Sequence, residues 1–532
     1  MNKFFLFAVT ILFLVGCKEK TESDKVINSE AIVSSEETLY RPNFHFTPKK
    51  GWMNDPNGMF FLNGKYNLYF QYYPDGNTWG PMHWGHATSE DLVTWEEQPI
   101  ALYPDSLGYI FSGSAVVDVN NYSGFGEDGK PPVVAMYTLH DSKGEKEGRN
   151  DFQTQAIAYS LDEGQSFIKY DKNPVITNLG NRDFRDPKVV WDEAHKQWVM
   201  VLAVGQEVKL YSSKNLKEWK YISDFGVEFG SHDGVWECPD LFPIQVEGTN
   251  KVKWVLITSI NPGNPNGGSG IQYFVGDFDG TWFNLDTSFE ANLKSNKAMW
   301  LDYGRDDYAG VTWSNIPKSD GRRLFIGWMS NWDYAKVVPT STWRSAMTLP
   351  RELKLKEINN GYRLYSVPVE EIESYETTKT EKENISFEKE YTLVDKNDID
   401  VNKSIIEVKL SKLENDIYTF RLSNPAGDLM EFGINNRDRY YFIDRSKSGH
   451  VDFSDKFANR TSKANFEKPL ENVNVQMVID KTSIELFYNH GETVMTEIFF
   501  PNSPMENLKL VTLSPLATTI DYLRISEVGL KH

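Results

Sequence analysis

The stretch Trp52-Met53-Asn54-Asp55-Pro56-Asn57-Gly58 runs into Met59-Phe60-Phe61 and then into an apolar segment at residues 66–73. The same change from polar to apolar recurs four more times, at residues 112–117, 185–190, 237–242 and 307–313. An apolar segment follows each opening, and a third and a more exposed fourth segment close each unit. Units of four strands that recur roughly every 50 to 75 residues are typical of a β-propeller. The sequence therefore predicts a five-bladed propeller over residues 41–355.

The turns between the units support this interpretation. Residues 89–95 (SEDLVTW) and 213–219 (SKNLKEW) are near copies at equivalent places in two units. Helical periodicity is nearly absent, which makes an α/β barrel a poor fit. We expect an all-β chain.

The repeating pattern ends after residue 355. Residues 356–383 resemble a linker, and residues 384–532 alternate between apolar and polar positions with turns between them. This pattern predicts a C-terminal β-sandwich. Its Asp444-Arg445 pair and Glu485 form no convergent cluster in the sequence, so we expect them to contribute to stability or to accessory contacts with a glycan.

Three of the five openings carry an acidic residue: Asp55, Asp186 and Glu237. The first strand of each blade lines the axis of a propeller, so we expect these side chains to meet at one mouth of the central channel. Asp-Pro pairs also cap turns, but a turn role does not explain acids at equivalent points of three blades. Glycoside hydrolysis needs two carboxyl groups across the scissile bond, and a third would stabilise the positive charge of the transition state.

The segments 52–58, 185–187 and 237–239 resemble the three signature motifs of glycoside hydrolase family 32, which includes invertases, inulinases and levanases. The similarity extends over essentially the whole chain beyond residue 40. It implies that Asp55 is the nucleophile that forms a fructosyl-enzyme intermediate, Glu237 the general acid/base, and Asp186 the transition-state stabiliser. A retaining enzyme would hold the two reacting carboxyl groups about 5–5.5 Å apart.

The resemblance also implies a substrate-binding pocket. Arg185 would orient the carboxylates and touch the sugar, and the residues that would line the terminal-fructose pocket are Asn54, Gln71, Trp79, Phe111 and Ser112. Cys238 follows the acid/base; it is either a thiol that adjusts the pKa of Glu237 or a buried thiol that fills space. This chemistry requires no cofactor. We assign no metal-binding residue, and the sequence leaves any need for a metal ion open.

The resemblance favours an enzyme that releases terminal fructose from levan- or inulin-type fructans and from sucrose. Endo-levanase is the nearest alternative, because loops beyond the first sugar decide between the two modes. A non-catalytic fructan-binding lipoprotein and a fructosyltransferase are further alternatives. The first would have lost a catalytic acid, whereas this chain keeps all three; the second would keep the same catalytic residues. The oligomeric state stays open.

The N-terminus has the pattern of an export signal. Lys3 precedes an apolar run, Phe4 to Val15, that is too short to span a bilayer. The run ends in Leu14-Val15-Gly16-Cys17, which resembles a bacterial lipobox. We expect residues 1–17 to be a lipoprotein signal with Cys17 acylated, and residues 18–40 to be a flexible tether to the cell envelope, at the periplasmic or surface side of the outer membrane. An ordinary cleaved signal peptide is the alternative.

Charge and cysteine content narrow the possible partners. The formal net charge is -19 at pH 7, which argues against nucleic acid or an anionic membrane surface as a partner. We expect contact with a membrane only through the N-terminal lipid. The chain has only two cysteines, so if Cys17 carries lipid, Cys238 has no disulfide partner.

Overall fold

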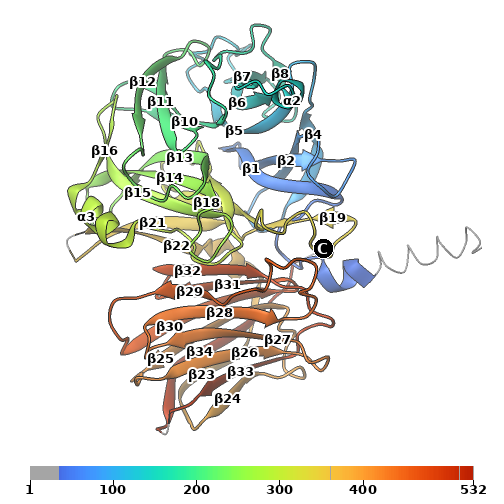
Figure 1. Cartoon of the computed structure of the whole chain (residues 1–532), viewed down its shortest axis with the longest axis vertical. Coiled ribbons are helices and arrows are strands. Elements are labelled where there is room, and N and C mark those ends of the chain that lie inside the picture. Colours follow the sequence, from blue (N-terminus) through green and yellow to red (C-terminus); the bar gives the residue numbers. More distant parts are fainter. Residues whose placement is uncertain (1–34, 360, 515, 531–532) are drawn as a thin grey trace, which may run out of the picture.

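The computed structural model describes residues 35–359, 361–514 and 516–530, and they form two β-rich domains, one above the other in Figure 1. The signal segment 1–17, Cys17 and the tether up to residue 34 lie outside the described residues. The first four sheets follow one another along the chain. They contain β1 (Gly51–Leu62), β2 (Lys65–Tyr73), β3 (His83–Ser89) and β4 (Glu96–Leu102); β5 (Tyr109–Val117), β6 (Val133–His140), β7 (Gln153–Ser160) and β8 (Ile168–Lys169); β9 (Phe184–Asp192), β10 (Gln197–Val204), β11 (Glu207–Ser213) and β12 (Lys220–Phe225); and β13 (Val235–Gln245), β14 (Val252–Asn261), β15 (Gly270–Phe278) and β16 (Phe283–Leu285).

A fifth sheet completes the ring with β17 (Tyr308–Thr312), β18 (Arg323–Met329), β21 (Arg351–Ile358) and β22 (Gly361–Pro368). The first strands of the five sheets surround the axis: β1 contacts β5, β5 contacts β9, β9 contacts β13, β13 contacts β17, and β17 contacts β1. The predicted five-bladed propeller is confirmed.

The closure of the ring differs from the prediction. The third segment of the last predicted unit, residues 342–348, contains two short strands instead of one. β19 (Trp343–Arg344) runs parallel to the start of β1, and β20 (Ala346–Met347) pairs with β18. β19, from the last unit of the propeller, thus pairs with the first blade and holds the first and last blades together.

The predicted boundary at residue 355 and the predicted linker, residues 356–383, are wrong. β21 spans the boundary, β22 ends at Pro368, and β23 (Glu376–Phe387) already belongs to the second domain. Only a 3-10 helix, η1 (Glu370–Tyr375), connects the two. Alternate residues of β21, such as Leu353 and Leu355, are buried in the core between the fourth and fifth blades. The predicted boundary therefore cuts through a strand whose buried face belongs to the propeller.

The second domain is a sandwich of two six-stranded antiparallel sheets, as predicted. One sheet has the order β23, β34 (Thr518–Val528), β25 (Lys403–Ser411), β30 (Asn472–Asp480), β31 (Ser483–Tyr488) and β32 (Thr493–Ile498). The other has the order β24 (Glu390–Val394), β33 (Asn507–Thr512), β26 (Ile417–Ser423), β27 (Leu429–Asn435), β28 (Tyr440–Lys447) and β29 (Ser462–Asn465). Apolar side chains of both sheets form one core between them.

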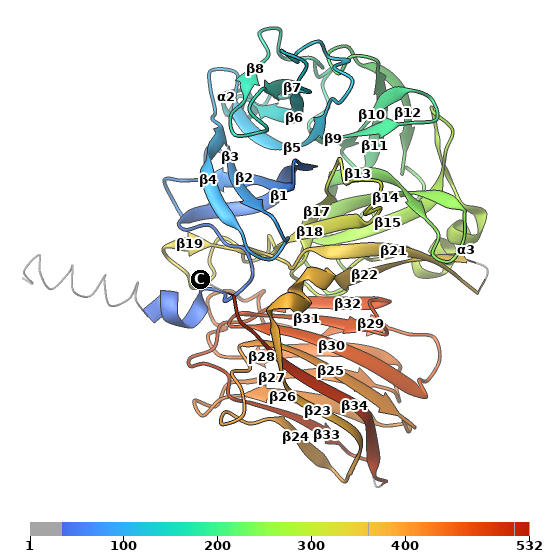
Figure 2. The same cartoon turned by 180° about the vertical axis from the view of Figure 1, so that it is seen from behind.

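Buried charges join the two domains, and β22 and β32 lie next to each other at this boundary in both views (Figure 1 and Figure 2). Arg351 of the propeller pairs with Glu485 of the sandwich, and Arg445 of the sandwich pairs with Asp306 of the propeller. His45 lies between Glu485 and Asp480, at 2.8 Å from each. All these side chains are almost fully buried. The expected structural contribution of Arg445 and Glu485 is thus a set of interdomain ion pairs.

In the part of the chain that the structure describes, helices are few and short. Besides η1, they are α2 (Ser142–Lys146), α3 (Thr287–Asn296) and one turn and a half at residues 35–40. The last part of the predicted tether, residues 35–40, is therefore helical, and Glu36 accepts hydrogen bonds from the backbone and the hydroxyl of Ser341. Within the described ranges, no helix combines the length and the apolar character needed to cross a membrane.

Candidate active site

A β-bulge interrupts the first strand of every blade at the same place, next to the predicted site residues. The pairing register shifts between Met53 and Pro56 in β1 and between Ile110 and Gly113 in β5. Equivalent shifts occur in β9 after Arg185, in β13 after Glu237 and in β17 after Tyr308. A bulge turns a side chain out of the regular alternation of a strand. Five bulges at one level therefore direct side chains of all five blades toward the mouth of the channel.

The bulges carry unusual backbone angles. Asp186, Cys238 and Ala309 have φ values of 65°, 45° and 54°. Residues other than glycine rarely adopt this left-handed region, and such conformations are frequent at functional sites. The backbone at the mouth is thus held in conformations that the surrounding sheet has to stabilise.

Asp55, on β1, is held by three neighbours. The Ser112 hydroxyl donates to its Oδ2 at 2.6 Å, and the Asn54 amide donates to its Oδ1 at 2.9 Å. The Cys238 thiol lies 3.4 Å from Oδ2. Burial raises the pKa of Asp55, and the negative charge of Glu237 adds to this effect, whereas the hydrogen bonds oppose it.

Asp186, on β9, is 5% exposed. Its Oδ2 accepts the backbone N–H of Cys238 at 3.0 Å and lies 3.6 Å from the Cys238 sulfur. The pKa of Asp186 is raised to about 7, chiefly by burial; the charges of Glu237 and Asp55 add to this increase, whereas Arg185 opposes it. Cys238 thus touches two of the three carboxylates, which places Asp55 and Asp186 on either side of one thiol.

Glu237, on β13, is paired with Arg185. The guanidinium donates to Glu237 Oε1 at 3.0 and 3.2 Å, and its Nε lies 4.0 Å from Asp186. The hydroxyl of Tyr308 donates to the other oxygen, Oε2. Burial raises the pKa of Tyr308 well above its usual value, so the phenol stays protonated and acts as a donor. Arg185 therefore lies between Glu237 and Asp186, and Tyr308 holds the second oxygen of Glu237.

Tyr308 is a site residue that the sequence analysis missed. Its position was visible, because it lies in the opening of the fifth blade, at the place where the other blades carry their acids. Its role was not, because only the fold shows that the fifth opening turns its side chain toward Glu237.

Some of the predicted pocket residues contact the three carboxylates, and others lie behind them. Asn54, Ser112, Arg185 and Cys238 contact the carboxylates directly, as described above. Gln71 is 2% exposed and donates both to Asn57 at 2.8 Å and to the carbonyl of Ile110 at 3.0 Å. Gln71 therefore links β1 and β5 next to their bulges and does not contact the carboxylates.

Aromatic side chains form one wall beside the cluster. The ring of Trp79 lies edge-on to Phe111 with 5.9 Å between the ring centres, and Phe111 stacks on His140 at 4.1 Å. Aromatic faces of this kind pack against the apolar faces of sugar rings. Trp79 and Phe111 are thus close enough to act together, and His140 is a second neighbour that the sequence analysis did not identify.

The arrangement is suited to acid/base and nucleophilic chemistry on a neutral substrate. Three carboxyl groups share the single positive charge of Arg185, so they do not all ionise easily at neutral pH. One ionised carboxylate and one proton donor across a bond are what glycoside hydrolysis requires. Among residues 35–359, 361–514 and 516–530, no group of three or more His, Cys, Asp or Glu side chains is arranged to hold a metal ion.

Comparison with known protein families adds an independent line of argument. Residues 45–368 match the model of the glycosyl hydrolases family 32 N-terminal domain, and residues 371–525 match that of the glycosyl hydrolases family 32 C-terminal region. The limit between the two matches falls where η1 joins the domains.

Individual proteins are similar over most of the chain. A levanase of Bacillus subtilis is 47% identical over 473 residues, which cover 88% of this chain and 68% of the levanase. An extracellular exo-inulinase of Aspergillus niger is 40% identical over 89% of this chain and 92% of its own length. The structure of an alanine variant of a fructofuranosidase from Schwanniomyces occidentalis in complex with fructosylnystose superimposes with a TM-score of 0.83, at 34% identity, over 93% of this chain and 98% of that chain.

Proposed function

The chain belongs to glycoside hydrolase family 32, and from this premise we propose that it is a retaining β-fructosidase that releases terminal fructose from levan- or inulin-type fructans and from sucrose. The family matches make it a glycosidase. Similar proteins named levanase and exo-inulinase support the fructan as substrate. The observation that carries the proposal is the cluster of Asp55, Asp186 and Glu237, joined through Cys238 and Arg185 at one channel mouth.

In the proposed first step, Asp55 attacks the anomeric carbon of the terminal fructose. The glycosidic bond breaks, and Glu237 donates its proton to the leaving oxygen. Ser112 and Asn54 each hold one oxygen of Asp55, so the attacking carboxylate has little freedom to rotate. In the second step, Glu237 removes a proton from water, which hydrolyses the fructosyl-Asp55 ester and restores both carboxyl groups.

Asp186 would stabilise the transition state of both steps. Positive charge develops on the sugar ring as the bond breaks, and a fixed carboxylate nearby lowers the barrier. Arg185 and Tyr308 would orient Glu237, since each contacts a different oxygen of it. The residues that we place around the fructose are Asn54, Gln71, Trp79, Phe111, Ser112 and Cys238; Asn54, Ser112 and Cys238 contact Asp55.

Substitution of the two reacting groups tests the mechanism. We expect Asp55→Asn and Glu237→Gln to lower kcat on sucrose by several orders of magnitude, while the unfolding temperature stays close to that of the wild type. Asp452→Asn, on the exposed surface of the sandwich, is the matched control and should keep full activity. Near-normal turnover in either site variant would refute the assignment.

The stereochemical outcome tests the retaining mechanism separately. With methanol as acceptor, a retaining enzyme converts sucrose into methyl β-fructofuranoside, which is identified by NMR. An inverted α-product would show that water or methanol attacks directly, and would contradict a carboxyl separation of about 5–5.5 Å between Asp55 and Glu237.

The early products decide between exo and endo attack. We expect fructose as the sole early product from both levan and inulin, in line with the exo-inulinase relative. The levanase relative keeps endo-levanase as the second candidate; an early ladder of oligosaccharides from levan would favour it. Accumulation of longer chains at high sucrose would instead indicate fructosyl transfer.

We also propose that the protein is exported and held at the bacterial cell envelope by lipid on Cys17. The lipobox-like residues 14–17 support the anchor, and the extracellular location in the name of a similar exo-inulinase supports export. A fructan polymer is too large to enter the cell intact, so an external location suits such a substrate.

A further inference from the structure

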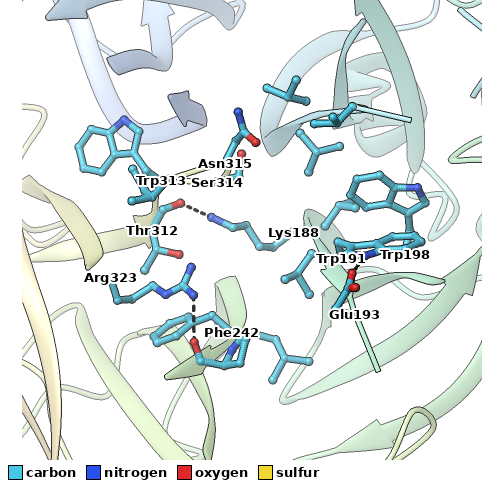
Figure 3. A pocket seen from close by; sticks show the side chains of 18 of the residues that line it. Lys188, Trp191, Glu193, Trp198, Phe242, Thr312, Trp313, Ser314, Asn315 and Arg323 are labelled. Carbon is cyan, nitrogen blue, oxygen red and sulfur yellow. Dashed lines mark hydrogen bonds between the residues drawn. The ribbon is translucent and has the colours of Figure 1, made fainter. Parts of the chain in front are cut away.

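The opposite end of the central channel opens into a second cavity of about 620 Å³ (Figure 3). We call it the distal cavity. The ends of the inner strands line it, whereas the candidate catalytic residues lie at their starts: on β13, Phe242 lines the distal cavity and Glu237 belongs to the active site. Five residues of strand separate these two positions, which corresponds to roughly 16 Å.

An ion pair lies between the two ends of the channel. The ammonium group of Lys188 lies 3.1 Å from Asp240 and also donates to the carbonyl of Thr312. Lys188 follows Asp186 and Pro187 on β9, so its side chain lies deeper in the channel than the candidate catalytic carboxylates. The two residues neutralise each other, and they separate the distal cavity from the active site.

Arg323, at the start of β18, projects into the distal cavity without an acidic partner (Figure 3). Its Nη2 donates to the carbonyl of Pro243 at 2.9 Å, but its Nε is buried and has no hydrogen-bond partner in the described ranges. No carboxylate of the described residues forms an ion pair with it, in contrast to its neighbour Arg322, which pairs with Asp320 and Glu371. A charge with little access to water is unfavourable without a direct partner, and no described carboxylate contacts the guanidinium of Arg323, although the charge of Asp240 acts on it from a distance.

The charges around the distal cavity do not supply a direct counter-ion. Glu193 at the rim pairs with Lys196. Asp240 pairs with Lys188, and its negative charge also acts on Arg323, but the two side chains form no ion pair. Lys318 at the rim adds a further positive charge. The cavity is thus locally positive in a chain whose formal net charge is -19.

Aromatic rings form the wall across the cavity from Arg323 (Figure 3). Trp191 and Trp198 meet at nearly a right angle with 5.0 Å between their ring centres, and Tyr122 stacks on Trp191 at 5.1 Å. Trp198 is 5% exposed, and its indole N–H is buried without a partner in the described ranges. Flat apolar faces with an unused donor are suited to hold the organic part of a ligand.

We propose that the distal cavity binds a small organic anion, with its carboxylate or phosphate group on the guanidinium of Arg323 and its apolar part against Trp191 and Trp198. Guanidinium groups bind both kinds of anion through paired N–H donors. The bound anion supplies the charge that Arg323 lacks, and its organic part covers the indole rings.

Isothermal titration calorimetry of the full-length protein tests the proposal without any need for catalytic activity. The probes are phenyl phosphate, benzoate and, as the uncharged comparison, benzyl alcohol. We expect binding of phenyl phosphate or benzoate, or of both, and at least about ten-fold weaker binding of benzyl alcohol. A preference between the first two identifies the anionic group.

Two adjacent arginines give matched variants. We expect Arg323→Gln to weaken binding of the anion at least about ten-fold, whereas Arg322→Gln, whose side chain is occupied by two carboxylates, changes it less than about two-fold. Trp198→Leu provides a second test in case Arg323→Gln does not fold, and it should weaken binding while the unfolding transition remains cooperative. Unchanged affinity in Arg323→Gln, equal binding of benzyl alcohol, or no binding heat with the wild type would overturn the proposal.

Discussion

The Asp186→Asn substitution should make the protein more stable at neutral and alkaline pH while it removes most of the activity. Asp186 is buried, and its pKa is raised to about 7 from 3.8. Asparagine fits the site, because it tolerates the positive φ of 65° at this position. Its amide oxygen also retains the acceptor for the backbone N–H of Cys238. The substitution therefore removes one negative charge with little change in shape.

The size and sign of the effect follow from the raised pKa. Ionised Asp186 is less stable in the folded state than in the unfolded chain, so its stabilising contribution is fully present below pH 3.8 and is lost as the pH rises through about 7. About three pKa units correspond to at most about 4 kcal/mol. Water at the channel mouth screens the charge, so we expect about 2 kcal/mol, or roughly 2–4 °C in the unfolding midpoint.

Differential scanning calorimetry between pH 4 and pH 8 measures this effect. The advantage of Asp186→Asn over the wild type should be smallest at pH 4, grow up to about pH 7 and then level off. Asp183→Asn is the control, because Asp183 contacts the same Arg185 at 2.7 Å and its removal should bring no gain at pH 8. If Asp186→Asn were less stable than the wild type at pH 8, or if its advantage did not depend on pH, the reasoning would be refuted.

Three further predictions concern other parts of the chain. Tyr308→Phe, which removes the donor to Glu237, should lower kcat about ten-fold with a smaller change in KM; an unchanged kcat would exclude a positioning role. His45 has its pKa lowered by burial but raised, to about 9 overall, by hydrogen bonds to Asp480 and Glu485. Its contribution to stability is present below about pH 6.5 and should be lost as the pH rises through 9, so the difference in urea stability between wild type and His45→Gln should shrink from pH 6 to pH 10; a constant difference would contradict this. Cys17→Ala should move the enzyme from the membrane fraction to the soluble fraction of cells, and a variant that stays in the membrane fraction would disprove the lipid anchor.

The repeats of the sequence were sufficient to predict the propeller, because each blade opens with the same change from polar to apolar residues. They were not sufficient to predict its end. In the last blade, β21 alternates buried leucines with lysines, and it pairs along its length with β22. Alternation of this kind is typical of any half-buried strand, so it does not reveal to which domain the strand belongs. Only the pairing with β18 decides that.

The candidate site shows the same division between local and global information. Asp55, Asp186 and Glu237 could be predicted from the sequence, because each lies in a short motif. The bulges that direct them were not, since a bulge is a shift of register between two strands and is a property of the pair. Tyr308 illustrates the consequence: its blade opening contains no motif, yet the bulge after it turns the phenol toward Glu237.

The two ends of the channel differ in how their charges are balanced, and this difference connects the main proposal with the further inference. At the active-site mouth, three carboxyl groups share one arginine, so the site favours a substrate on which positive charge develops. At the distal cavity, Arg323 forms no ion pair with a carboxylate of the described residues and Asp240 is shared with Lys188, so the site favours a ligand that already carries negative charge. The Lys188–Asp240 pair between them is neutral and buried. An anion on Arg323 would therefore act on the active site mainly through the intervening side chains, and catalysis and distal binding should be separable by mutation.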